Sequence, residues 1–245
     1  MSMIDNYFRN MTELLEKTLA SQKESLEKAS QKIAESLKNG GMLYTFGTGH
    51  GHLLALEIFY RAGGMAKVCP ILDERLMLHI NAAESSGWER AEGLEDELLK
   101  KYPIQAGDVL ISISNSGRNT VPVMLAKAAK ERGAFVIALT SMQHTSSVTP
   151  RNKAGLRLFE AADLVLDNGG ILGDAAMQMA DGAYVGPTST AVGASMLQAI
   201  ACRVKEISLE EGWEAEYFKS SNVDGGDEYN QKLLDKYKAL IPGLA

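Results

Sequence analysis

The stretch Asp108–Thr120, with the sequence DVLISISNSGRNT, decides the fold that this chain is expected to adopt. It begins with an apolar, β-branched run, Val109–Ile113, that is short enough for a strand buried on both faces. A polar turn of small residues, Ser114–Thr120, follows, and a helical pattern then runs over Val121–Arg132. This order of strand, turn and helix is typical of a parallel α/β unit, which puts the turn at the carboxyl end of its strand.

The turn at Ser114–Thr120 admits two interpretations. Backbone N–H groups and hydroxyls at a helix N-terminus, in the positive field of the helix dipole, suit an anion and above all a phosphate. The alternative is a plain strand-to-helix connection whose serines only cap the helix. The spacing of these residues alone does not decide between the two.

Further apolar runs extend this unit into a larger sheet. The expected strands are Met42–Phe46, Lys67–Leu72, Val109–Ile113, Phe135–Leu139 and Ala162–Asp167. The expected helices between and after them are Leu53–Ala62, Trp88–Lys101, Val121–Arg132, residues 188–207 and Gln231–Leu240. Strands that alternate with helices predict a five-stranded, parallel, doubly wound sheet between helical layers, which is a three-layer αβα sandwich.

A long helical pattern, from residue 4 to about residue 38, precedes the first strand, and Asn39-Gly40-Gly41 ends it. The polar residues Ser21–Glu24 interrupt its apolar stripe and suggest a break into two helices. The distal half is expected to pack on another subunit or on the C-terminal helix of the same chain. The chain thus divides into this N-terminal helical segment, residues 1–38, a central domain, residues 39–210, and a C-terminal tail, residues 211–245.

Composition narrows the function classes. The 245 residues carry 25 Lys and Arg against 31 Asp and Glu, a formal net charge of −6, so nucleic acid is not an expected partner. The early charges argue against a signal peptide, and no apolar run approaches about 18 residues, so no membrane partner is expected. The two cysteines, Cys69 and Cys202, are too few for a disulfide framework and fit a cytoplasmic protein.

A second glycine-rich junction, Gly47–His52, follows the first expected strand. Its sequence, GTGHGH, lacks the glycine spacing of a dinucleotide-binding fingerprint and the lysine of a P-loop. We interpret it as a place where a ligand approaches the backbone, with His50 as a candidate acid–base residue. No third ligand stands at helical spacing from His50 and His52, so no metal is expected. Both turns fall at carboxyl ends of parallel strands, and this convergence favours the phosphate interpretation.

With both turns placed, residues 35–207 resemble the sugar isomerase (SIS) domain, a flavodoxin-like fold that binds phosphosugars. In the isomerase domain of glucosamine-6-phosphate synthase, the turn that matches Ser114–Thr120 reads Ser-Gln-Ser-Gly-Glu-Thr. Asn119 replaces the last threonine, and Thr120 stands one position later. The resemblance implies that the substrate-binding residues are Thr48, Gly49, Ser114, Asn115, Ser116, Asn119 and Thr120.

Two groups of enzymes in this family suggest where a base would lie. The segment Glu57–Arg61 is similar to the Glu-Leu-x-Gly-Arg of phosphoheptose isomerases, whose glutamate serves as a base; the late-helix histidine of those enzymes has no counterpart in residues 188–207. The segment Ala91–Asp96 is similar to the Glu-Gly-Ala-Glu-Asp of N-acetylmuramic acid 6-phosphate etherases.

Both reactions remove a proton next to a carbonyl, which requires a carboxylate base near the sugar and donors for the developing enolate. Glu92 and Glu57 are therefore the candidate bases, and His50 is a candidate proton shuttle. Glu92 belongs to a run of acidic residues on one expected helix, which is more often a solvated face than a site: Glu89, Glu92, Glu95, Asp96 and Glu97.

The whole chain most resembles an uncharacterised bacterial group of SIS proteins. The resemblance implies a sugar-phosphate isomerase of the aldose–ketose type that uses no metal or other cofactor and assembles as a homodimer or homotetramer. The alternatives are a phosphosugar lyase of the etherase type and a regulatory protein that binds a phosphosugar without turning it over. SIS regulators normally carry a helix-turn-helix domain before the SIS domain, whereas about 38 residues precede the first expected strand here.

Overall fold

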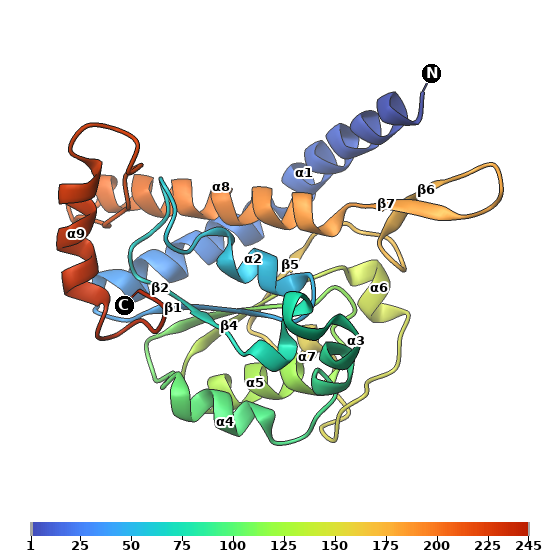
Figure 1. Cartoon of the computed structure of the whole chain (residues 1–245), viewed down its shortest axis with the longest axis horizontal. Helices are drawn as coiled ribbons and strands as arrows, with labels where there is room; N and C mark the ends of the chain where they lie inside the picture. The colour runs from blue at the N-terminus through green and yellow to red at the C-terminus, as the bar shows by residue number, and fades with distance from the viewer. Residues whose placement is uncertain (1, 245) are drawn as a thin grey trace.

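A five-stranded parallel sheet forms the centre of the molecule in the computed structural model, which describes residues 2–244 (Figure 1). Its strands are β1 (Leu43–Gly47), β2 (Val68–Ile71), β3 (Val109–Ile113), β4 (Phe135–Thr140) and β5 (Leu164–Asp167). They are arranged in the order β2-β1-β3-β4-β5, and every neighbouring pair is parallel. The predicted sheet is confirmed, with strand ends within two residues of the expected ones.

The central strands β1 and β3 are buried on both faces, which explains why apolar residues dominate both strands without alternating with charged ones. Val109 of β3 is in register with Leu43 of β1 and with Phe135 of β4. This register aligns the carboxyl ends of the three strands at one edge of the sheet. The turns that follow β1 and β3 therefore lie next to each other.

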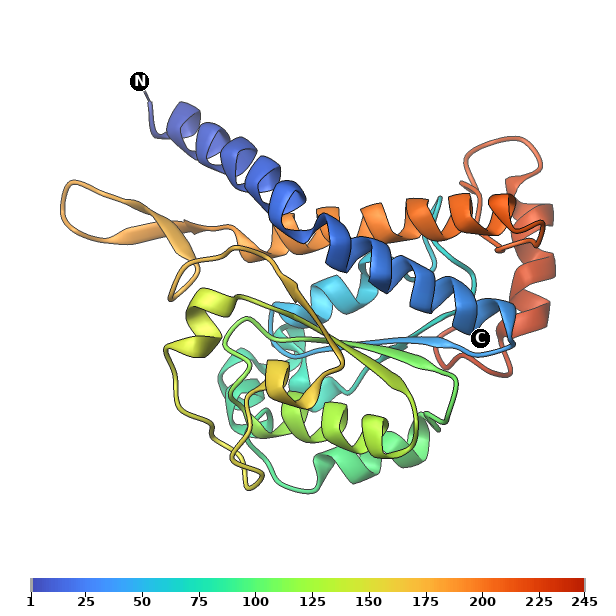
Figure 2. The same ribbon diagram turned by 180° about the vertical axis from the view of Figure 1, so that it is seen from behind.

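Two helical layers enclose the sheet, so the predicted αβα sandwich is confirmed (Figures 1 and 2). One face shares its core with α1 (Met3–Lys38), α2 (Gly51–Glu57) and α8 (Ser189–Glu210). The other face shares its core with α4 (Leu94–Lys101), α5 (Thr120–Glu131), α7 (Leu158–Ala161) and α9 (Gly226–Tyr237). Shorter elements lie in the connections: η1 (Glu74–Leu76), α3 (Leu78–Trp88) and α6 (Met142–Ser146). None of the helices in residues 2–244 combines the length and hydropathy that a membrane span requires.

Helix α1 is continuous over 36 residues, so the break predicted at Ser21–Glu24 is wrong. Gln22, within that polar stretch, accepts a hydrogen bond from the Asp167 N–H at the end of β5, at 3.0 Å. The polar residues thus contact a strand end instead of interrupting the helix. The C-terminal half of α1 packs on the sheet, whereas its N-terminal half projects from the body (Figure 2).

The segment between β2 and β3 differs from its expected structure. The helix predicted over Trp88–Lys101 is divided, because α3 ends at Trp88 and α4 begins only at Leu94. Between them Gly93 has a φ of +82°, a conformation that residues with a Cβ rarely adopt. The irregular connection over residues 89–93 points neighbouring side chains in different directions, which matters for the site.

A β-hairpin that the sequence analysis did not predict leads into α8. It consists of β6 (Ala175–Gln178) and β7 (Tyr184–Pro187), and it extends beside the projecting half of α1 (Figure 1). The Tyr7 hydroxyl of α1 donates to the Pro187 carbonyl at 2.8 Å, which links the two projecting elements.

Candidate functional site

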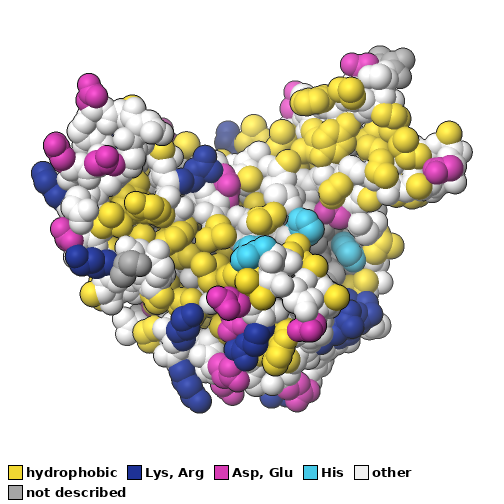
Figure 3. Space-filling view, viewed as in Figure 1, with side chains coloured by type: hydrophobic (Ala, Val, Ile, Leu, Met, Phe, Trp, Pro, Cys, Tyr) yellow, Lys and Arg dark blue, Asp and Glu magenta, His cyan; other side chains and the backbone are white. Residues whose placement is uncertain are grey.

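A cleft of about 380 Å³ opens at the carboxyl edge of the sheet. It lies where the strand order reverses between β1 and β3, the position at which doubly wound sheets bind ligands. Its walls come from the turns after β1 and β3, the connection after α3, helix α6, the loop after β5 and the start of α8. The size is that of a small-molecule site, and Figure 3 shows histidine side chains gathered on this face.

The turn after β3 is held in place by Ser114 and Gly117. The Ser114 Oγ accepts a hydrogen bond from the Gly117 N–H at 3.2 Å, and the Ser114 N–H donates to the Leu139 carbonyl of β4 at 3.1 Å. Gly117 has a φ of +55°, and a Cβ there would lie 2.8 Å from the Thr145 hydroxyl. Both the backbone conformation and the available space therefore require glycine.

This turn presents unpaired donors to the cleft. Within the described part of the chain, the backbone N–H groups of Asn115 and Ser116 and the Ser116 hydroxyl have no hydrogen-bond partner. They lie beside the N-terminus of α5, where the helix dipole adds positive potential. No Lys or Arg side chain lines the described cleft, so an anion here would be held by neutral donors and the dipole.

Asn119 and Thr120 occupy different positions relative to the cleft. Asn119 lines it, and its buried Oδ1 has no partner among the described residues. Thr120 is absent from the cleft lining, and its hydroxyl bonds to the backbone carbonyls of Arg90 and Arg151, both at 3.0 Å. Thr120 therefore fixes the neighbouring loops, whereas Asn119 is available to a ligand.

The turn after β1 supplies Thr48, Gly49 and His50 to the facing wall. The His50 side chain is exposed, and its ring has no hydrogen-bond partner among residues 2–244. His52 is buried instead: its Nδ1 lies 2.7 Å from the Gly49 carbonyl oxygen, and its ring stands 5.8 Å from that of His79. His52 thus fixes the turn, and His50 is the histidine of this turn that lines the cleft.

The carboxylate that contacts the turn after β1 is supplied by Glu89. The Thr48 hydroxyl donates to Glu89 Oε1 at 2.7 Å, and no hydrogen bond reaches Oε2 from the described residues. The Glu89 backbone carbonyl accepts the Val121 N–H of α5 at 3.0 Å, which fixes the residue next to the N-terminus of that helix. Glu89 is half-buried and lines the cleft, although its acidic run predicts a solvated helix face.

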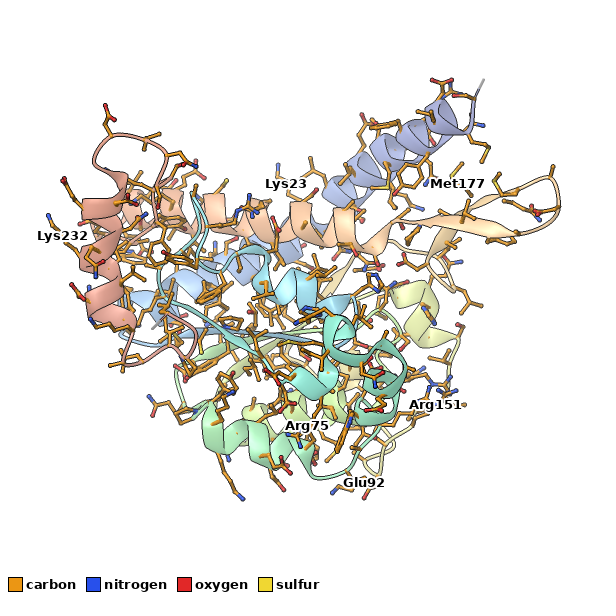
Figure 4. All side chains as sticks on the ribbon, viewed as in Figure 1. Lys23, Arg75, Glu92, Arg151, Met177 and Lys232 are labelled. Carbon is orange, nitrogen blue, oxygen red and sulfur yellow. The ribbon has the colours of Figure 1, made fainter. Side chains whose placement is uncertain are left out.

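The two candidate bases from the sequence, Glu92 and Glu57, lie outside the cleft lining. Glu92 is exposed in the irregular connection before Gly93 and projects away from the body of the protein (Figure 4). Glu57 ends α2, forms an ion pair with Arg61 and accepts a hydrogen bond from the Gln198 Nε2 of α8 at 3.0 Å. The break after α3 accounts for the difference between Glu89 and Glu92, because it turns Glu89 inward and Glu92 outward.

Residues that the sequence did not single out complete the cleft on the side of α8. Asp174, with a φ of +68°, accepts hydrogen bonds from the Ser189 hydroxyl at 2.5 Å and the Ser189 N–H at 2.9 Å. Asn168 donates from its Nδ2 to the Asn115 Oδ1 at 2.7 Å, and His144 lines the same wall. The available signal was position, because His144 and Asn168 each follow closely on the end of a strand, β4 and β5.

Burial lowers the pKa of His144 below its usual value; Asp174 opposes this shift, and Arg118 adds to it. Among the described residues, no group of three or more His, Cys, Asp or Glu side chains is arranged to hold a metal ion. The arrangement can therefore bind an anion at one end and offer a carboxylate and imidazoles to the rest of the ligand.

The family follows from comparison with known proteins. The family model described as the SIS domain matches residues 6–141, which is more than half of the chain. The chain belongs to the SIS domain family. It is 43% identical over 244 residues to a UPF0309 protein of Halalkalibacterium halodurans and 44% identical over 244 residues to one of Listeria innocua. Each match covers 99% of this chain and 98% of the relative.

Solved structures share the fold of this SIS protein. The phosphoheptose isomerase from Neisseria gonorrhoeae superposes with a TM-score of 0.53 at 16% identity, over 83% of this chain and 97% of that one. The phosphoheptose isomerase from Francisella tularensis gives a TM-score of 0.54 at 15% identity, over 84% of this chain and 100% of that one. At these identities the likeness concerns the fold alone.

Proposed function

We propose that this SIS protein is a sugar-phosphate isomerase of the aldose–ketose type, with Glu89 as its base. One observation carries the proposal: the anion turn Ser114–Asn119 and the Glu89 carboxylate line the same cleft. A base serves proton abstraction only when the substrate is held beside it, and a bound phosphate supplies that positioning. The fold shared with two phosphoheptose isomerases agrees with this proposal.

The phosphate-binding part of the proposal rests on Ser114, Asn115 and Ser116. The N–H groups of Asn115 and Ser116 and the Ser116 hydroxyl are free to donate, and Ser114 shapes the turn that presents them. Asn119, with an unpaired Oδ1, would accept from a sugar hydroxyl. Thr48 and Gly49 would contact the sugar from the turn after β1. Thr120 lies outside the cleft and fixes the neighbouring loops through its hydroxyl.

The catalytic part of the proposal rests on Glu89, which replaces Glu92 and Glu57 as the candidate base. The Thr48 hydroxyl fixes one carboxylate oxygen, which leaves Oε2 to take the proton from the carbon next to the carbonyl. The C–H bonding pair then becomes the second C–C bond of the enolate, and the carbonyl π pair moves to oxygen. Return of the proton to the former carbonyl carbon, together with transfer of the hydroxyl proton from one oxygen to the other, completes the isomerisation. His50, exposed at the mouth of the cleft, is placed to carry a proton between the two oxygens.

We also propose that two copies of the chain pair through their projecting elements. Large apolar side chains stand exposed on α1 and on the hairpin, among them Ile4 at 71%, Phe8 at 69% and Tyr184 at 56%. Figure 3 shows apolar side chains gathered over this region. Pairing about a twofold axis buries the same apolar face on both protomers and needs no other protein. A second copy of the chain is therefore the favoured partner for this face.

The reaction is tested by incubating the purified protein in D₂O with a panel of pentose, hexose, hexosamine and heptose phosphates. Proton NMR then follows deuterium at the carbon next to the carbonyl and the appearance of the isomer. The proposal expects exchange with at least one sugar of the panel. Binding without exchange across the panel would assign the protein to ligand-binding regulators, and elimination of a substituent would assign it to lyases.

A further inference from the structure

His144 has a ring environment that is unusual for a histidine in a cleft. Its helix, α6, directly follows β4, and its backbone N–H is fixed by the Ser141 Oγ at 3.1 Å. The side chain lines the cleft, yet its Nδ1 is buried and has no hydrogen-bond partner among the described residues. The buried position of Nδ1 leaves Nε2 as the ring nitrogen that can reach a ligand.

The unpartnered Nδ1 determines which form of the ring is favoured. A buried N–H without an acceptor loses a full hydrogen bond to water, so the tautomer with a bare Nδ1 and a proton on Nε2 costs less than its alternatives. The imidazolium form requires an N–H at both nitrogens and is disfavoured for the same reason.

Two charged groups near His144 act in opposite directions on the charge of its ring. Asp174, from the loop after β5, favours the charged ring, but its carboxylate already accepts hydrogen bonds from the Ser189 hydroxyl and N–H. Arg118, which faces it from the turn before α5, donates to the Thr149 carbonyl at 2.9 Å and disfavours a second positive charge nearby. The other titratable groups that line the cleft are Glu89 and His50.

We infer that His144 is a neutral hydrogen-bond donor that stabilises the enolate oxygen of the substrate through its Nε2–H. The inference rests on the proposed isomerase function and adds a second catalytic residue to it. Glu89 takes the proton from carbon, negative charge develops on the former carbonyl oxygen, and His144 donates a hydrogen bond to that oxygen without losing its proton. A neutral imidazole serves this role well, because it stabilises the charge without protonating the intermediate.

The role is tested with two substitutions of different chemistry. His144→Gln keeps an N–H donor at a reach similar to that of Nε2, whereas His144→Leu removes the donor. Loss of one preorganised donor typically lowers kcat about 100-fold or more, so we expect that loss in His144→Leu and a loss of less than about tenfold in His144→Gln. Gln143→Leu, at an exposed position of the same helix, is the matched control and should retain wild-type exchange.

Nitrogen-15 NMR of the ligand-free wild-type protein tests the ring itself, independently of turnover. We expect a neutral His144 with its proton on Nε2 at pH 7–8, and hence no change in kcat/KM from this residue across that range. An imidazolium at pH 7, a proton on Nδ1, or equal exchange by wild type and His144→Leu would overturn the role of His144 and leave the proposed isomerase function standing. Absence of exchange by the wild type on every sugar would overturn the isomerase function as well.

Discussion

Replacement of Ser116 by alanine isolates the contribution of the anion turn to ligand binding. The Ser116 hydroxyl is half-buried, lines the cleft and makes no hydrogen bond to the described residues, so its removal leaves the turn intact. A hydrogen bond from a hydroxyl to a phosphate is worth about 1.5–3 kcal/mol. This range corresponds to an increase in Kd of about 10- to 150-fold. Because water competes at a half-buried position, we expect a value near the lower end, about tenfold.

Ser114→Ala provides the contrasting variant. Ser114 is 7% exposed, and its Oγ accepts the Gly117 N–H, so alanine removes an internal bond of the turn. Leaving that N–H without a partner should lower the free energy of unfolding by about 1–3 kcal/mol and should also weaken ligand binding. Ser116→Ala should weaken ligand binding without changing the free energy of unfolding.

Phosphorus-31 NMR titration with inorganic phosphate measures the affinity, and urea unfolding measures the stability. Ser86→Ala, at an exposed position on α3, is the control and should change neither quantity. Unchanged phosphate affinity in Ser116→Ala would refute the assignment of the turn as the phosphate site. A loss of affinity in Ser86→Ala would show that the measurement does not report on the cleft.

Three further predictions concern assembly, thiol chemistry and stability. Phe8→Glu places a charge on the exposed apolar face and should convert the dimer to a monomer, which halves the mass of the protein measured by light scattering. Equal masses for wild type and variant would contradict pairing through this face. Burial, together with nearby Asp108, raises the pKa of the Cys69 thiol to about 12. At pH 8, a thiolate-specific reagent should therefore modify the native protein at exposed Cys202 and not at Cys69. Two reactive thiols per chain would contradict this prediction. Asp108→Ala removes the acceptor of two backbone hydrogen bonds, at 2.9 and 3.0 Å, and should lower the free energy of unfolding in urea by about 2 kcal/mol or more, whereas exposed Asp224→Ala should leave it unchanged.

The sheet could be predicted because its signals are local. Val109–Ile113 is mostly apolar and rich in β-branched residues, and the turn that follows it begins with small polar residues, so the strand and its junction are visible in a short window. The hairpin was missed because its strands are short and largely solvent-exposed and lack a continuous apolar run. Asp181-Gly182 at its turn is the one local signal that could have indicated it.

The site could be predicted only in part, because the choice of the carboxylate depends on tertiary geometry. The turns after β1 and β3 both contribute residues to the cleft, and each turn follows directly from a strand end in the sequence. Glu89 and Glu92 are three residues apart in one acidic run, and helical periodicity places them on the same solvated face. Helix α3 ends at Trp88, before either glutamate, and residues 89–93 are irregular, so only the folded chain distinguishes the two carboxylates.

The measurement that tests the central claim most directly is solvent-deuterium exchange by Glu89→Gln, with Glu92→Gln as its matched control. The glutamine preserves the shape of the side chain but cannot take a proton, so exchange should fall by about 100-fold or more while phosphate affinity stays within a few-fold of wild type. Glu92→Gln, changed at an exposed position outside the cleft, should exchange at the wild-type rate. Normal exchange by Glu89→Gln, or its loss in Glu92→Gln, would contradict the account.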